Sequence, residues 1–111
     1  MSTRLSPPVP ECPAYLAGAL RKRWDELAPQ LAKMGTLDAL NTDVLAKYIL
    51  AENNYLQVSS YVQGAITSAD PEDAAKWLLA QDRLTKQILA LGEELGITPR
   101  ARKARGLIIP R

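Results

Sequence analysis

Apolar residues recur at helical spacing in three segments of the chain. In the first segment, which follows Pro13, they are three or four positions apart: Leu16, Leu20, Trp24, Leu27, Leu31 and Met34. This spacing predicts a helix with a single apolar stripe. Gly35 is expected to end the helix in a left-handed conformation. Pro29 lies inside the stripe, so we expect either a kink there or two short helices that share a face.

The second segment runs from Asn41 to about Thr67 and is the longest helix candidate. Asn41 or Thr42 is expected to cap its first free N–H groups. Its main apolar seam repeats in heptads: Val44, Tyr48, Ala51, Tyr55, Val58, Val62 and Ala65. A second apolar row lies beside the seam: Leu45, Ile49, Leu56 and Ile66. A stripe of this width predicts that the helix contacts more than one neighbour.

The third segment has a well-marked start and end. Asp70 is the expected N-cap, Pro71 the first helical residue, and Gly96 the residue that ends the helix. Its seam again has heptad spacing: Trp77, Gln81, Leu84, Ile88, Leu91 and Leu95. Gln81 is the one polar member. It either fixes register or oligomeric state, or is hydrogen-bonded within a helical hairpin.

These segments predict an all-α fold of one domain. We expect a kinked N-terminal helix, a long antiparallel helical hairpin, and a short basic helix or tail that begins at Thr98-Pro99 and ends at Gly106. No segment shows the alternation typical of strands. The expected organisation is a proline-rich extended lead-in over residues 1–13, a helical oligomerisation domain over 14–96, and a basic C-terminal segment over 97–111.

The composition argues against several classes of function. The chain has no histidine, which removes the commonest general base and metal ligand. Cys12 is the only cysteine, so an internal disulfide and a cysteine metal cluster are excluded. The glycines form no phosphate-binding loop, and no apolar run suits a membrane span or a signal peptide. We therefore expect no catalytic residue, cofactor, metal, small-molecule substrate or membrane contact, and a cytosolic location.

Positive charge is concentrated in two clusters. Residues 1–98 carry nine basic and twelve acidic residues, whereas residues 99–111 carry five basic residues and no acid. The tail cluster suits contact with phosphates or serves as a solubilising tail: Arg100, Arg102, Lys103 and Arg105. The other cluster lies within the first helix: Arg21, Lys22 and Arg23. Pairing with Asp25 and Glu26 at i,i+4 spacing would neutralise two of its three charges, and nucleic-acid contact is the alternative.

The order of these elements resembles the small subunit of phage terminases. The resemblance runs from Pro7 to Gly106 through PPVPECPAYLAGALRKRWDELAPQLAKMG, TLDALNTDVLAKYILAENNYL and LGITPRARKARG. Its most specific parts are W-x-x-L-A-P-x-L, which starts at Trp24, and the LGITP motif at Leu95 with the basic residues after it. The loop TSADPED is shorter than is usual in that family.

The resemblance implies a non-enzymatic part of the viral DNA-packaging motor in the cytoplasm of the bacterial host. Such proteins assemble as rings through helical hairpins and bind double-stranded phage DNA near the packaging start. They deliver it to the large terminase subunit, which holds the ATPase and nuclease, and they modulate those activities. Leu107, Ile108 and Ile109 would then dock on a partner or pack on a neighbouring subunit.

On this basis both basic clusters are candidate DNA contacts. The candidate oligomer interface comes from the two seams: Val44, Tyr48, Tyr55, Val58, Val62, Trp77, Leu84 and Ile88. Two alternatives remain. One is a helix-turn-helix regulator with its turn at Met34-Gly35-Thr36, although the following helix has little basic character. The other is a helical adaptor that binds protein and no nucleic acid.

Overall fold

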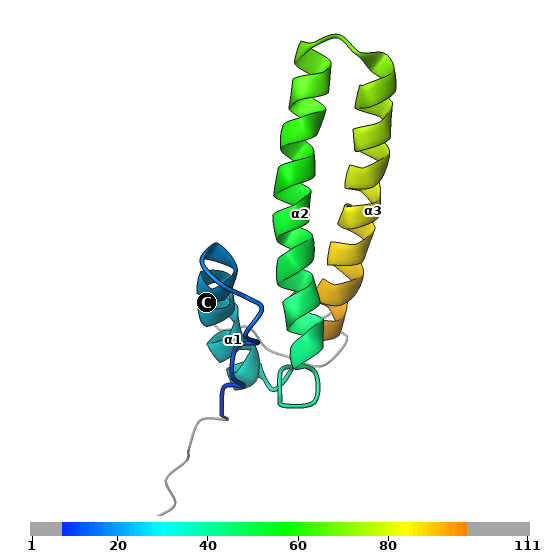
Figure 1. The fold of residues 1–111 in the computed structure, drawn as a ribbon. Coiled ribbons are helices and arrows are strands. Elements are labelled where there is room, and N and C mark those ends of the chain that lie inside the picture. Colours follow the sequence, from blue (N-terminus) through cyan, green and yellow to red (C-terminus); the bar gives the residue numbers. More distant parts are fainter. Residues whose placement is uncertain (1–7, 98–111) are drawn as a thin grey trace, which may run out of the picture.

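A computed structural model describes residues 8–97 of the chain, which form three helices and no strand. The helices are α1 (Ala19–Met34), α2 (Thr42–Thr67) and α3 (Pro71–Leu95). Helices α2 and α3 run antiparallel as a long hairpin, and α1 packs beside its base (Figure 1). The predicted all-α class and hairpin are confirmed for these residues. The short basic helix predicted from Thr98 lies outside them.

Helix α1 begins later than its apolar stripe. Leu16 lies in a turn before the helix, where its N–H donates to the carbonyl of Pro13 at 3.0 Å, yet its side chain is only 1% exposed. The helix runs through Pro29 as one element, so the expectation of two short helices is wrong. Pro29 itself is exposed and lies inside α1. Gly35 ends α1 with φ 82°, as predicted.

The connection between α1 and α2 is organised by Asn41 in an unexpected way. Asn41 precedes α2, but its side chain makes no capping hydrogen bond to that helix. Its amide instead donates to the carbonyl of Thr36 at 2.8 Å, and its Oδ1 accepts from the N–H of Asp38 at 2.8 Å. The side chain therefore braces a connection of residues 35–41. This connection and the 26-residue α2 do not match the tight turn and short helices of the helix-turn-helix alternative.

The hairpin follows its sequence signals closely. The Asp70 carboxylate accepts from the N–H of Asp73 at 3.1 Å, and Gly96 ends α3 with φ 70°. Gln81 donates from Nε2 to the Ser59 hydroxyl at 2.8 Å, which confirms the interpretation of a hydrogen bond within the hairpin. The hairpin's two strongest local predictions, its cap and its closing glycine, are thus both confirmed.

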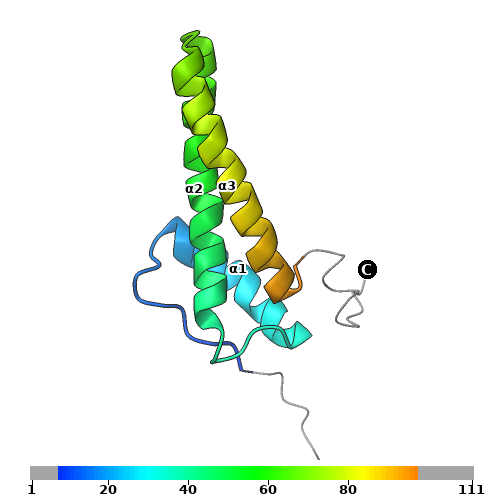
Figure 2. The same ribbon diagram turned by 90° about the vertical axis from the view of Figure 1, so that its right-hand side faces the viewer.

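The core lies at the base of the hairpin, where α1 meets it (Figure 2). It consists of a cluster of ten buried side chains: Leu16, Trp24, Ala28, Leu31, Leu37, Leu45, Ala46, Tyr48, Ile49 and Leu95. Leu45 and Ile49, from the second apolar row of α2, are buried in this cluster, whereas Leu56 and Ile66 further along that row are exposed. The prediction that α2 contacts two neighbours therefore holds only near its N-terminal end.

Leu45 offers a direct test of this core. The Leu45 side chain is 0% exposed, so Leu45→Ala is expected to lower the free energy of unfolding by about 2–5 kcal/mol, through reduced burial and the cavity left behind. Leu40 is 91% exposed, and the same truncation there should change stability by less than about 0.5 kcal/mol. Urea unfolding followed by circular dichroism compares the two variants. Equal effects would contradict the placement of the core.

Candidate functional site

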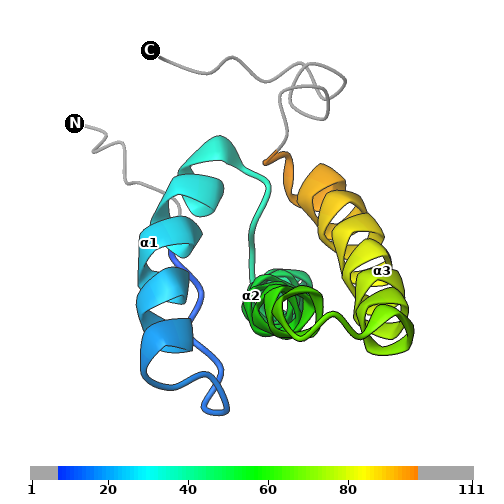
Figure 3. The same cartoon turned by 90° about the horizontal axis from the view of Figure 1, so that it is seen from above.

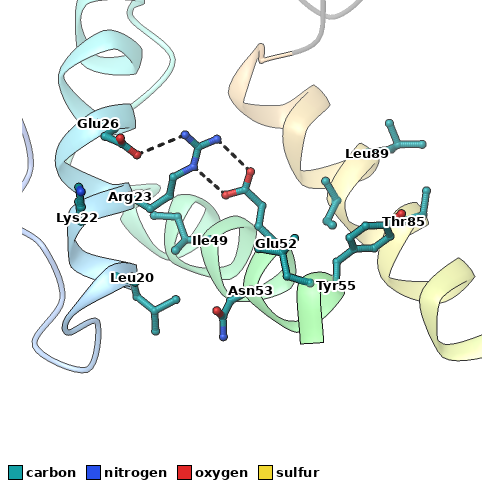
Figure 4. A pocket seen from close by; sticks show the side chains of 13 residues that line it. Leu20, Lys22, Arg23, Glu26, Ile49, Glu52, Asn53, Tyr55, Thr85 and Leu89 are labelled. Carbon is teal, nitrogen blue, oxygen red and sulfur yellow. Dashed lines mark hydrogen bonds and ion pairs between the residues drawn. The ribbon is translucent and has the colours of Figure 1, made fainter. Parts of the chain in front are cut away.

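Arg23 is the member of the first basic cluster that is held in place. Its Nε and Nη2 donate to the two carboxylate oxygens of Glu52 at 3.0 and 3.1 Å, and its Nη1 lies 3.6 Å from Oε1 of Glu26 (Figure 4). Glu52 belongs to α2, so this two-pronged ion pair ties α1 to the hairpin. The hydrogen bond to Glu52 raises the pKa of the Arg23 guanidinium further and keeps it charged.

This pairing corrects the expected neutralisation of the cluster. The i,i+4 pairs with Asp25 and Glu26 do not form. Within residues 8–97, Arg21 and Lys22 are exposed and make no ion pair. One of the three charges is neutralised, through a partner 29 positions away, and two remain available on the surface of α1. Sequence spacing alone carries no signal for that distant partner.

Two side chains of the described residues, Cys12 and Tyr48, have raised pKa values and are not activated as nucleophiles. Burial raises the pKa of the Cys12 thiol above 9.0, against the opposing effect of Arg21, so the thiol stays protonated at neutral pH. Burial also raises the pKa of the Tyr48 phenol above 10.0, and the negative charge of Glu52 adds to this shift. Neither group is therefore prepared for covalent catalysis.

Residues 8–97 show neither a cluster of metal-ligating side chains nor a helix suited to crossing a membrane. Nowhere in this part of the chain do three metal-ligating side chains come together. None of its three helices combines the length and the apolar character that crossing a bilayer needs. What the described structure does offer is charge on α1 and an apolar groove beside it.

The groove lies between α1 and the hairpin and has a volume of about 600 Å³. Seen along the hairpin, α1 and α3 flank α2, so that α2 forms the floor and the other helices form the walls (Figure 3). Most of the lining is apolar: Ala19, Leu20, Ile49, Tyr55, Leu56, Ile88 and Leu89. Lys22 also lines it, and the Arg23 ion pairs with Glu26 and Glu52 lie along one side (Figure 4).

Sequence reasoning missed this groove. Leu89 lies outside the seam of α3, and Leu56 belongs to the second row of α2 beyond the reach of α1. The one sequence signal for the groove was that neither leucine had a predicted packing partner on another helix. A groove requires the relative placement of three helices, which periodicity along one helix does not give.

The predicted oligomer-interface residues lie on the hairpin, mostly toward its interior. Tyr48 and Val62 are buried within the single chain, and the other six are half-buried: Val44, Tyr55, Val58, Trp77, Leu84 and Ile88. Their role between subunits stays a prediction. The large apolar side chains exposed on the hairpin are a different set: Leu56, Tyr61, Ile66, Leu78, Leu79 and Leu89. Tyr61 stacks on Trp77 with ring centroids 4.6 Å apart.

The second basic cluster lies outside the described residues. It comprises four predicted DNA contacts: Arg100, Arg102, Lys103 and Arg105. The structure consequently does not place them relative to Arg21 and Lys22, and the assignment of both clusters to DNA stays a prediction.

Tyr48 predicts a pH dependence of stability. Because its pKa is raised in the folded chain, the unfolded chain loses the phenol proton first as the pH rises. The protonated phenol therefore favours the folded chain. Its contribution to folding stability is fully present below the ordinary pKa of 10.0 and is lost as the pH rises through the raised pKa of the folded chain. Urea unfolding at pH 8 and at a pH of about 10.5 should show a smaller loss for Tyr48→Phe than for the unmodified protein. Tyr61→Phe, at an exposed position, is the control, and equal losses in all three proteins would contradict this account.

Comparison with known proteins assigns the chain to a family. No curated protein and no solved structure matches it. The family described as phage terminase, small subunit, matches residues 21–106, a range that takes in α2, α3 and both basic clusters. Since the match covers well over half of the 111 residues, the chain belongs to the phage terminase small-subunit family.

Proposed function

We propose that this protein is a ring-forming, DNA-binding subunit of a viral packaging motor, without catalytic activity of its own. It binds double-stranded phage DNA near the packaging start, delivers it to the large terminase subunit, and regulates the ATPase and nuclease of that subunit. The observation that carries the proposal is the family match over residues 21–106. The charge and surface of the described residues add independent support.

Two exposed cations support DNA contact by α1. Arg21 and Lys22 have no ion-pair partner within the described residues, so neither would have to give up a carboxylate to bind a phosphate. Phosphate contacts of this kind fix the position of a protein on DNA and make its affinity depend on salt, but they do not distinguish one base sequence from another. Repeated around a ring, two such charges per subunit, with the basic run of residues 100–105, would sum to a positive field that a single copy lacks.

The surface of the hairpin supports assembly. Apart from the groove residues Leu56 and Leu89, large apolar side chains are exposed on both α2 and α3, and a monomer gains nothing by keeping them in water: Tyr61, Ile66, Leu78 and Leu79. A ring requires two different surfaces that fit each other, because a head-to-tail contact closes only after several copies. A hairpin with exposed apolar residues on both of its helices can supply two such surfaces.

The tail cluster gives the first test of DNA binding. Replacing Arg100, Arg102, Lys103 and Arg105 with Ala should weaken binding to duplex DNA and flatten its salt dependence, by roughly 0.9 in the log–log slope for each phosphate that the variant no longer binds. Fluorescence anisotropy over a salt series measures both quantities. The matched control removes four basic residues outside the clusters: Lys33, Lys47, Arg83 and Lys86. An equal reduction in this control would show that only net charge matters.

A second variant locates the contact if the tail is dispensable. Arg21→Ala with Lys22→Ala should then reduce affinity and the salt slope, since these are the exposed cations of the first cluster. Unchanged binding in both variants would contradict the assignment of DNA contacts to either cluster. No binding to duplex DNA by the unmodified protein at low salt would favour the adaptor alternative.

Native mass spectrometry tests the assembly and its partner together. The protein at micromolar concentration should form one defined oligomer larger than a dimer, and addition of duplex DNA should give a complex that keeps the same number of subunits. A monomer at these concentrations would rule out a ring built from the hairpin alone. A dimer with sequence-selective, salt-tolerant binding would instead favour a gene-regulatory protein.

A further inference from the structure

The groove between α1 and the hairpin exposes large apolar side chains to solvent. Leu56 on its floor is 68% exposed and Leu89 on its wall is 53% exposed, although both line a concave surface. Covering an exposed leucine side chain removes apolar surface from water, which is favourable. The groove is therefore a favourable place for another apolar segment.

The size of the groove favours a short segment over a second globular surface. Its volume of about 600 Å³ falls within the range of roughly 300–1,000 Å³ that is typical of pockets for small ligands. A stable contact between two folded copies buries about 800 Å² on each partner, well beyond a single slot beside one helix. Three or so consecutive apolar residues are a better match.

The chain itself contains such a segment within reach. Leu107, Ile108 and Ile109 form the one run of large apolar residues in the sequence after Ile97. Leu107 is ten positions after Ile97, and an extended chain of that length spans up to about 33 Å. Leu89, the lining residue of α3 closest to the end of that helix, lies six residues before that end, which is about 9 Å along a helix. The chain between Ile97 and Leu107 is therefore more than long enough for Leu107 to reach Leu89.

Charge at the side of the groove suits the same segment. Glu26 is half-exposed, and its ion pair with Arg23 is a long one at 3.6 Å. The apolar run is flanked in sequence by Arg105 and Arg111. The two carboxylates of the lining balance its two basic side chains in number, so the groove does not repel a basic segment. A contact of either arginine with Glu26 would add the modest contribution typical of exposed pairs.

We propose that the groove binds Leu107, Ile108 and Ile109 of the same chain. Tethering gives the segment an effective concentration of about millimolar, which favours the intramolecular site over that of another copy. Docking would also hold the basic run of residues 100–105 near Lys22, so that the two basic clusters form one cationic surface. That last consequence rests on the proposed DNA-binding function, whereas the docking itself does not.

Disulfide trapping tests the docking without DNA. In a Cys12→Ser background of the full chain, Ile108→Cys is combined with either Leu89→Cys or Gln87→Cys. Leu89 lines the groove, whereas Gln87 is also exposed, only two residues away on α3, and outside the lining. Two residues along a helix point about 200° apart, so the variants differ in direction and hardly in distance from the tail.

Under mild oxidation, the Leu89→Cys pair should form an intrachain disulfide at least about tenfold faster than the Gln87→Cys pair, because docking adds to the concentration that the tether alone provides. Non-reducing gels and mass spectrometry separate intrachain from interchain products, and circular dichroism checks that both variants fold. Equal rates would overturn the proposal. A disulfide-linked dimer formed by the Leu89→Cys variant would assign the groove to the tail of a second copy and would overturn it as well. Neither result would affect the proposed role in DNA packaging.

Discussion

The architecture depends on the packing of α2 against both other helices at the base of the hairpin. Near its N-terminal end, α2 contacts both other helices, and its Leu45, Tyr48 and Ile49 are buried there in one cluster with Trp24 of α1 and Leu95 of α3. Because α1 and α3 flank the same helix, they form two walls beside a shared floor and do not close over it. The groove is a direct consequence of this arrangement. Since α1 has only 16 residues, it covers α2 near its N-terminal end and leaves Leu56 exposed.

The ion pair between Arg23 and Glu52 adds an electrostatic constraint to this packing. It fixes the side of α1 that faces the hairpin, and thereby determines which charges of the RKR sequence point to solvent. A pair that is half-exposed contributes little stability by comparison with the buried leucines. Its main effect is on orientation. Arg21 and Lys22 are left on the surface without carboxylate partners among the described residues, beside a groove that is otherwise apolar.

Arg21, Lys22 and the groove therefore lie toward the base of the hairpin, on or beside α1, whereas Tyr61 and Trp77 lie within about two turns of the loop that joins α2 and α3. This division suits the proposed function, in which the protein contacts DNA at one end of the hairpin and other subunits along its length. The exposed apolar residues of the hairpin are spread along both helices. Assembly through them would leave the basic end available, which the proposed function requires.

The sequence by itself determined the elements whose signals are local. The hydrophobic spacing, the Asp70 cap and the closing glycines Gly35 and Gly96 placed the helices to within a few residues, and motif order pointed to the correct family. A cap or a left-handed glycine acts over a few residues, so neighbouring sequence is sufficient to predict it.

Only the tertiary structure decided which side chains meet. It placed Leu16 in the core from outside a helix, gave Asn41 a role in the loop, and paired Arg23 with a residue 29 positions away. It also buried Tyr48 and Val62 of the predicted interface seam, left the other six residues of that seam half-buried, and exposed a different apolar set. These outcomes depend on how three helices share one core, because contact between distant positions is set by packing and not by spacing along any one of them.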